Sequence, residues 1–271
     1  MKKETAIFLF HIIPLPIRKA IVTSLSRLVY YLSLKHRLIA LHNLMRSFPE
    51  KPLKEIFNIA RASYDNFAIM AVEFSEVLSL NKDNLHRWIS VRGLENYTNA
   101  CREGKGVLLF SAHFGNWEIG NAALALLNKP LVFMVRRLDS PFLEEVTTYL
   151  RSACGNSSLH KQKAMRQTLR LLKSGETINI LVDQNVFWNE GVFVDFFGRP
   201  ACATSGIAQM ALHTGATVMS AFTIRLPNGK YLLELGPKVK IVNTGNHDAD
   251  VLVNTQNIIK IIEEYVRKYP G

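Results

Sequence analysis

Apolar and polar positions follow one another in blocks that predict strands and helices in turn along most of the chain. Apolar runs that end abruptly predict buried strands, and periodic apolar positions predict helices. The predicted strands cover residues 107–110, 131–135, 177–182 and 192–197, and the predicted helices cover 38–44, 53–78, 119–127, 141–153, 163–173, 204–213 and 250–268. Residues 88–96 are predicted to form a short strand and the start of the next helix. Two more strands, 217–225 and 230–235, flank Pro227-Asn228-Gly229, a hairpin signal. This order predicts an α/β fold with a mixed, largely parallel sheet flanked by helices.

The first 36 residues form a helical segment of different character, so we divide the chain into 1–36 and an α/β domain at 37–271. Residues 5–17 carry no charge but include two prolines, and they are shorter than the roughly 20 apolar residues of a transmembrane helix. From Lys19 onward a helical stripe of apolar residues runs beside basic ones. This stripe either faces a core or lies on a membrane surface, and the two parts together suggest a dip into the bilayer followed by a surface helix.

Charge supports an anionic partner for this segment. The net charge is +11, and residues 1–50 hold eight basic residues against two acidic ones. Basic residues combined with apolar surface favour an anionic membrane over nucleic acid. Cys101, Cys154 and Cys202 are far apart and form no metal-binding spacing. We therefore expect no disulfide framework, no zinc site and a reducing, cytoplasmic-side location.

A histidine and a carboxylate stand where the strand at 107–110 passes into the next helix, in Ser111-Ala-His-Phe-Gly-Asn-Trp-Glu118. Strand-to-helix junctions are where α/β folds usually place their chemistry. With His113 in the loop and Glu118 in the first helical turn, the carboxylate can fold back to the imidazole and hold one tautomer. The alternative is a structural histidine beside a solvated helical glutamate.

Competing chemistries have less support at this junction. Ser111 lacks the G-x-S-x-G elbow of a serine hydrolase, and the histidine lacks the second histidine of an H-E-x-x-H metal site. Gly104-Lys105-Gly106 precedes a strand, whereas a phosphate-binding loop follows one. We expect neither a metal nor a cofactor.

Other polar groups follow predicted strands and should emerge at the same sheet edge. Arg136 and Arg137 close the strand at 131–135, and Asp183-Gln184 end the strand at 177–182. Arginine suits bidentate phosphate contacts, although a solvated pair is an equal alternative for these two. Phe196 and Phe197, with Arg199, either wall an apolar slot or belong to plain core.

The HFGNWE run resembles the H-x4-E motif of the bacterial lipid A biosynthesis (late, or secondary) acyltransferases, which are related to the glycerolipid acyltransferases. Further matches follow in the family's order: Arg37 with Asn43-Leu44 and Phe48-Pro49-Glu50, Arg136 to Pro141, Arg151 with Gly155, Asp183-Gln184, Phe196-Phe197-Gly198 and Gly215-Ala216. The similarity spans roughly residues 30–269. It implies a glycerolipid-acyltransferase-like α/β fold. The family commonly has an amino-terminal transmembrane helix, whereas the run here is short and broken by proline.

The resemblance implies an O-acyltransferase at the cytoplasmic face of the bacterial inner membrane. His113 would be the general base on a hydroxyl of a lipid A precursor, and Glu118 would orient it. Acyl-carrier protein, or acyl-CoA, would be the donor, with no covalent acyl-enzyme. Backbone N–H groups, with Asn116 or an arginine, would bind the oxyanion. Head-group and chain contacts would come from Arg136, Arg137, Arg151, Asp183, Gln184, Phe196, Phe197 and Arg199.

Two alternatives stay open at this point. The acceptor could be another membrane lipid, such as a phosphatidylinositol mannoside or an amino-acid lipid. The chain could instead be a non-catalytic basic protein that binds membrane or nucleic acid, which would explain its charge but not the polar residues placed at strand ends.

Overall fold

The computed structural model describes residues 2–160 and 164–271, which form two compact units. The first unit comprises Met1–Glu76 and Tyr265–Gly271, and the second comprises Val77–Glu264. The boundary at Glu76 falls later than the expected one at residue 36, because the helices that follow residue 36 pack with those before it.

The first unit is helical. Its helices are α1 (Lys3–Ile12), α2 (Leu15–Leu32), α3 (Leu34–Ser47) and α4 (Leu53–Phe74). Pro14 precedes α2 and Pro16 lies in its first turn, where a missing N–H costs no hydrogen bond. Among the described residues no single helix is long and apolar enough to cross a bilayer, and α1 and α2, bent by 102°, meet that requirement only as a pair.

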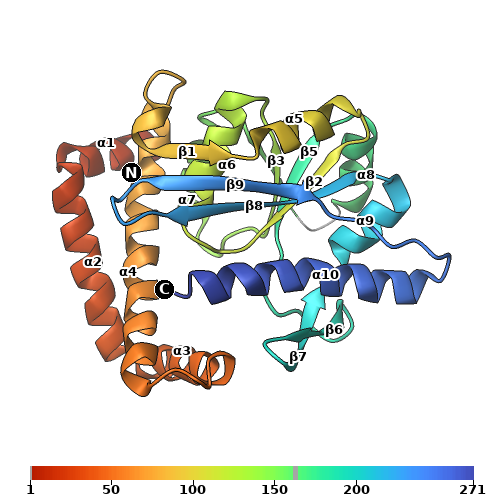
Figure 1. Cartoon of the computed structure of the whole chain (residues 1–271). Coiled ribbons are helices and arrows are strands. Elements are labelled where there is room, and N and C mark those ends of the chain that lie inside the picture. The colour runs from red at the N-terminus through yellow and green to blue at the C-terminus, as the bar shows by residue number, and fades with distance from the viewer. Residues whose placement is uncertain (1, 161–163) are drawn as a thin grey trace. The chain divides into compact units, whose positions relative to one another are not determined.

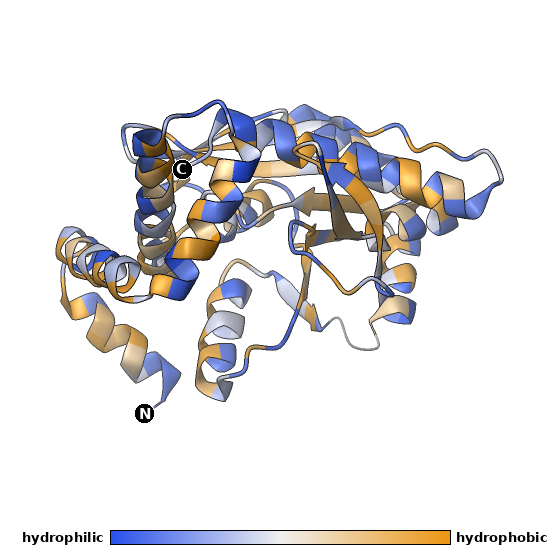
Figure 2. Cartoon of the chain, turned by 90° about the horizontal axis from the view of Figure 1, so that it is seen from below, coloured by the Kyte–Doolittle hydropathy of each residue, from blue (hydrophilic) through white to orange (hydrophobic). Residues whose placement is uncertain are grey.

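Helix α2 packs on α4 with its polar face inward. Arg18, only 5% exposed, pairs with Glu76 at 2.8 Å, Lys19 pairs with the buried Glu73, and Arg27 binds both oxygens of Asp65. The apolar stripe predicted along this helix is therefore turned outward, and it does not face a core. Its exposed members, together with those of α1, are Phe8, Leu9, Ile12, Ile13, Ile17, Ile21, Leu25, Leu28, Val29 and Leu32. The helix that starts at the N mark in Figure 2 shows this apolar character after its first turn.

The second unit is built on a seven-stranded sheet of order β1-β9-β8-β2-β5-β3-β4. Its strands are β1 (Ile89–Arg92), β2 (Val107–Ser111), β3 (Val132–Val135), β4 (Ser157–His160), β5 (Thr177–Leu181), β8 (Thr217–Arg225) and β9 (Tyr231–Lys238). All neighbours are parallel except β8 and β9. This confirms the predicted mixed, mostly parallel sheet, and the antiparallel pair is the predicted hairpin.

Helices cover the sheet on both faces. They are α5 (Leu94–Arg102), α6 (Trp117–Leu127), α7 (Pro141–Ser152), α8 (Met165–Lys173), α9 (Gly206–Thr214) and α10 (His247–Lys268). Short 3₁₀ turns lie at Ser75–Ser79 and Leu85–Arg87. Figure 1 shows α5 and α10 on opposite sides of β8 and β9. Every residue of β2 is buried, as a central strand covered on both faces requires. Lys163, the predicted start of α8, lies outside the described residues.

A two-stranded antiparallel ribbon, β6 (Gly191–Phe196) and β7 (Arg199–Thr204), stands apart from the sheet. Its turn contains Phe197, which has a φ of 57°, in the left-handed region that a bulky residue rarely adopts. Hydrogen bonds hold the turn: Asp195 Oδ1 accepts from the Gly198 N–H at 3.0 Å, and Glu263 of α10 accepts from the Phe197 N–H at 2.8 Å.

Candidate functional site

The junction between β2 and α6 has the strand–loop–helix form predicted from the sequence. Gly115, with a φ of 58°, brings the loop against β8: a Cβ there would stand 1.7 Å from the Thr223 carbonyl oxygen. Gly120 likewise lets the helix lie close to β8, since a Cβ added there would stand 1.9 Å from Thr223 Oγ1. Two glycines thus let loop and helix lie directly on the sheet, and this fixes the position of His113.

His113 pairs with Asp183, from the end of the neighbouring strand β5. Its Nδ1–H donates to Asp183 Oδ1 at 2.9 Å, and its backbone N–H donates to Asp183 Oδ2 at 3.0 Å. Strands β2 and β5 are parallel and in register from Val107↔Thr177 to Ser111↔Leu181, so both residues leave the sheet at the same edge. This confirms the expected shared edge. Since an ionised carboxylate only accepts, Nδ1 carries the proton and Nε2 is the basic nitrogen.

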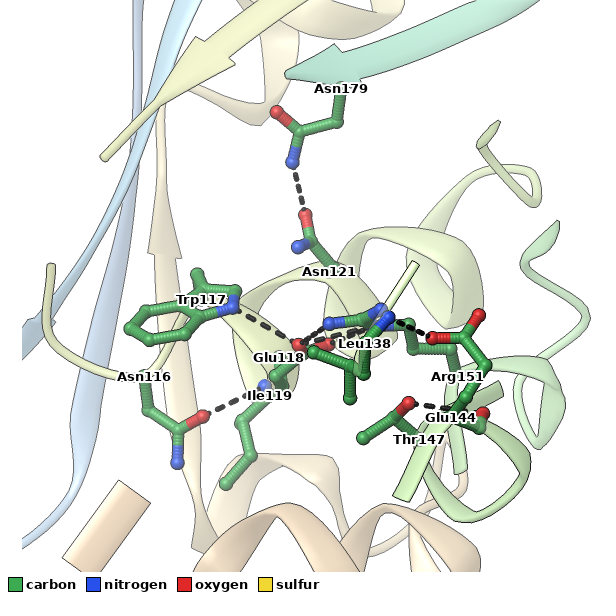
Figure 3. A network of polar contacts seen from close by, with 10 residues as sticks. All are labelled: Asn116, Trp117, Glu118, Ile119, Asn121, Leu138, Glu144, Thr147, Arg151 and Asn179. Carbon is green, nitrogen blue, oxygen red and sulfur yellow. Dashed lines mark hydrogen bonds and ion pairs between the residues drawn. The ribbon is translucent and has the colours of Figure 1, made fainter. Parts of the chain in front are cut away.

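Glu118 does not fold back to His113, and that expectation from the sequence is wrong. Its carboxylate is 5% exposed and binds Arg151 of α7, with Nη2 at 2.6 Å from Oε1 and Nε at 3.1 Å from both oxygens (Figure 3). A buried carboxylate needs a paired cation, and the guanidinium supplies two parallel donors. Arg151, expected to bind a head group, is thus engaged within the protein.

Trp117 links the two pairs, and reasoning from the sequence missed it. Its indole ring meets the His113 ring edge to face, with centroids 5.0 Å apart, and its Nε1–H donates to Glu118 Oε1 at 3.1 Å (Figure 3). Trp117 lies between His113 and Glu118 in the sequence. An indole, which has both an apolar ring and an N–H donor, could have been predicted there to contact both residues. Through Trp117, the Glu118–Arg151 pair fixes one wall around His113.

Asn116 and Ser111 have structural positions. Asn116 is fully buried and caps α6, with its Oδ1 accepting from the Ile119 N–H at 3.1 Å. The cap uses the side-chain oxygen, and the assignment of Asn116 to the oxyanion stays a prediction. Ser111 is 2% exposed, and its hydroxyl makes no hydrogen bond among the described residues. It therefore lacks the base that would activate a serine nucleophile.

Arg136 and Arg137 follow β3, which is parallel to β5, so they leave the sheet at the same edge as His113 and Asp183. Both are exposed, and Arg136 lies 3.6 Å from Asp139. Their loop is held by Glu144 of α7, whose Oε2 accepts from the Leu138 N–H at 2.8 Å (Figure 3). Sequence reasoning missed Glu144, because a first-turn acid on a helix ordinarily signals capping alone.

The remaining predicted residues divide between the site and the ribbon. Gln184 is exposed beside Asp183. Phe196, Phe197 and Arg199 lie at the turn of the β6–β7 ribbon, where the two phenyl rings meet edge to face with centroids 4.8 Å apart. Phe197 is 8% exposed, so it packs as core rather than as the wall of an open slot.

A buried polar pair lies under the junction. Asn179 of β5 donates to Asn121 of α6 at 2.6 Å (Figure 3). Asn156 donates from its amide to the Asn121 carbonyl oxygen at 3.3 Å and accepts from the Leu131 N–H at 2.9 Å. These bonds join α6 to the strands that carry Asp183 and the arginine loop, so they hold the parts of the site in register.

The histidine–carboxylate pair lies at the carboxyl ends of parallel strands, which is where open α/β sheets bind their ligands. The arrangement is therefore typical of an enzyme active site. Comparison with known sequences identifies which enzymes share it. The chain belongs to the family described as bacterial lipid A biosynthesis acyltransferase, whose profile matches residues 5–271. It is therefore an acyltransferase.

Characterised relatives agree with this assignment. A lipid A biosynthesis acyltransferase from Haemophilus influenzae is 24% identical over 238 residues, covering 87% of this chain and 74% of the relative. A lipid A biosynthesis lauroyltransferase from Escherichia coli is 24% identical over 80% of this chain and 71% of its own. A phosphatidylinositol mannoside acyltransferase from Mycolicibacterium smegmatis is 25% identical over 65% of this chain and 59% of its own.

Proposed function

We propose that this protein transfers a fatty acyl chain from a thioester donor, acyl-carrier protein, to a hydroxyl of a lipid A precursor, with His113 as general base. The bond between His113 Nδ1 and Asp183 carries the proposal. It leaves Nε2 as the basic nitrogen of a side chain that is 38% exposed at the ligand-binding edge of the sheet.

The reaction needs no covalent enzyme intermediate. Nε2 takes the hydroxyl proton as the acceptor oxygen bonds to the thioester carbonyl carbon. The tetrahedral intermediate then expels the thiolate, and the imidazolium returns the proton to the sulfur. Asp183 holds the reactive tautomer and stabilises the imidazolium.

Charge on the carbonyl oxygen requires donors near His113. The first-turn N–H groups of α6, at Trp117 and Glu118, point out of the helix amino terminus, and the Asn116 cap already uses the N–H of Ile119. We assign the oxyanion to these two groups. Glu118 and Arg151 then act as positioning residues, since they hold Trp117 and the start of the helix.

Exposed cations suit a phosphorylated acceptor. Arg136 is 78% exposed at the same sheet edge as His113, and Arg137 is exposed beside it. Arginine binds phosphate with two parallel hydrogen bonds. We assign the head group to this pair, and we place the enzyme at the cytoplasmic face of the inner membrane, with the outward apolar stripe of α1 and α2 on the anionic lipid surface.

The test uses purified protein with acyl-carrier protein thioester and lipid A precursor in mixed micelles, read by mass spectrometry. His113→Ala should abolish product, and Asp183→Asn should lower kcat by about two to four orders of magnitude, the usual contribution of general acid–base catalysis. His247→Ala, an exposed histidine on α10, is the matched control. Turnover retained by His113→Ala would remove the general-base role, and equal rates with acyl-CoA would remove the preference for the carrier protein.

A second candidate is acylation of a phosphatidylinositol mannoside, favoured by the Mycolicibacterium relative. Presenting both acceptors in one reaction separates the two, because product masses differ. Exclusive acylation of the mannoside would replace the lipid A proposal and leave the role of His113 intact.

A further inference from the structure

Three aromatic side chains project from the segment that directly follows Asp183. Phe187 is 75% exposed, Trp188 is 77% exposed and Phe193 is 60% exposed, and these are the highest values among the large apolar residues of the second unit. We call these three residues the aromatic tip. Large exposed apolar groups gathered in one place mark an interaction surface rather than ordinary exposure.

Cys202 of β7 lies beside both Phe187 and Phe193, and Trp188 follows Phe187 in the chain. Phe193 is the register partner of Cys202 on the ribbon, and the Cys202 thiol donates to the Phe187 carbonyl oxygen at 3.5 Å. The Val186 N–H donates to the Cys202 carbonyl oxygen at 3.0 Å, and the turn closes as the Glu190 N–H donates to the Phe187 carbonyl oxygen at 2.8 Å. The aromatic tip is therefore one local surface formed by a turn and an adjoining strand.

A fixed scaffold supports this surface. Helix α10 holds the ribbon beside it (Figure 1), since Gln256 both donates to the Asp195 carbonyl oxygen at 3.0 Å and accepts from the Asp195 N–H at 2.7 Å. Within the ribbon, Val194 is 4% exposed and Cys202 is 5% exposed. The aromatic tip is thus exposed on and beside an ordered, hydrogen-bonded element.

The aromatic tip is close to the reaction centre along the chain. Phe187 is four residues after Asp183, so an extended chain separates their Cα atoms by about 14 Å at most. Asn185, between them, accepts from the Cys202 N–H at 3.2 Å and ties this connection to the ribbon. Whatever the tip binds therefore lies near the bound substrate.

We propose that the aromatic tip inserts into the headgroup region of the bilayer that contains the acceptor lipid, as a second membrane contact beside the site. This rests on the proposed lipid acceptor. Tryptophan favours the boundary between hydrocarbon and water, and phenylalanine is typical of the apolar face that inserts shallowly into it. Three side chains are too few for a stable interface with a second copy, which buries about 800 Å² on each partner, whereas shallow insertion needs no more.

Tryptophan fluorescence tests the insertion directly. Vesicles of phosphatidylethanolamine and phosphatidylglycerol that contain brominated acyl chains should quench the full-length protein, and Trp188→Phe should remove most of that quenching, with Trp88 and Trp117 as the remaining fluorophores. Equal quenching of Trp188→Phe and the parent protein would overturn the proposal. This measurement needs no turnover, so it stays informative even if the proposed reaction fails.

Activity provides the second measurement. Replacing all three residues of the tip by serine should lower kcat/KM about tenfold or more for acceptor embedded in vesicles, and leave turnover of detergent-dispersed acceptor unchanged. Leu252→Ser with Val253→Ser, two exposed apolar positions on α10, is the matched control. An equal loss with both acceptor forms would overturn membrane insertion and indicate a role in the reaction. A dimer in solution that the serine variant loses would instead identify a second copy as the occupant.

Discussion

Two carboxylates stand near His113, and their partners give them different tasks. Asp183 contacts the imidazole, whereas Glu118 contacts Arg151 and the indole of Trp117. On the proposed mechanism, Asp183 controls the proton on the ring, and Glu118 controls where the ring and the helix start are placed. Substitution of Asp183 should change the dependence of rate on pH, and substitution of Glu118 should mainly change stability and substrate alignment.

Removing Arg151 should show how much the Glu118–Arg151 ion pair contributes to stability. Arg151→Met leaves the Glu118 carboxylate buried without its cation, which costs about 3–5 kcal/mol of unfolding free energy. Urea unfolding measures the loss. The double variant Arg151→Met with Glu118→Gln should regain much of the lost stability, because the buried negative charge of Glu118 is then also removed. A single Arg151→Met variant as stable as the parent would show that the pair contributes nothing to folding.

At the scale of elements, the close approach of α6 to β8 sets the position of the loop that carries His113. Gly115 and Gly120 both face Thr223, one against its carbonyl oxygen and the other against its hydroxyl. The two contacts lie on either side of the Asn116 cap. The loop and the first turn of α6 therefore both pack against Thr223 of β8. The start of α6 is thus fixed from the sheet side.

Gly120→Ala tests this contact. Alanine in an exposed helix would add up to about 1 kcal/mol of stability, but here the methyl group would overlap Thr223 Oγ1, and we expect a loss of about 1–3 kcal/mol together with reduced turnover. Thr223→Ala in the same chain should recover both. Gly206→Ala, at the start of α9 where a Cβ has room, is the control and should keep full stability. Thermal unfolding followed by circular dichroism measures the three variants.

The elements that the sequence predicted well are those with a single strong pattern. Strands β2 and β5 are unbroken apolar runs, and Pro227-Asn228-Gly229 fixes the β8–β9 hairpin. Strands β4 and β7 were missed. Ser157-Ser-Leu-His160 is too polar to show a buried face, and β7 begins Arg199-Pro200 and holds small residues. Pairing within the sheet or ribbon, rather than local preference, makes these segments extended.

The site was predicted as a location, but its pairing was not. The sequence places His113, Asp183 and Arg136 after strands, and a shared edge follows once those strands are parallel. Whether Asp183 or Glu118 meets the imidazole depends on which strand lies beside β2 and in what register. The order of strands in the sheet thus decides which carboxylate contacts His113. The spacing of residues within the HFGNWE motif does not predict it.

At the scale of the whole molecule, the first unit has the polarity of a membrane-contacting element. Ionic pairs hold α2 to α4, and the apolar stripe is left on the outside. In water this arrangement leaves apolar surface exposed, and covering that surface with lipid, as proposed, would be favourable. The net charge of +11 adds attraction to an anionic lipid surface.

Three residues on this stripe provide the test. Leu25, Leu28 and Leu32 are 55%, 52% and 74% exposed at helical spacing. Replacing all three by serine should weaken binding to vesicles of anionic lipid by about two orders of magnitude, if each leucine contributes about 1 kcal/mol by partial burial. Sedimentation with vesicles measures it. Three serines at Leu127, Leu252 and Val253 in the second unit are the control, and an equal effect there would show that the stripe has no special role.

The distance in sequence between His113 and Asp183 also has a kinetic consequence. The two residues are 70 positions apart, and they meet only when β2 and β5 have paired in parallel. Parallel pairing of distant strands costs loop-closure entropy before their contacts form. It is therefore a slow step in folding. Helix formation alone therefore does not bring His113 and Asp183 together, because their contact requires the paired strands. On the proposed mechanism, the protein therefore becomes active only once its central strands have paired.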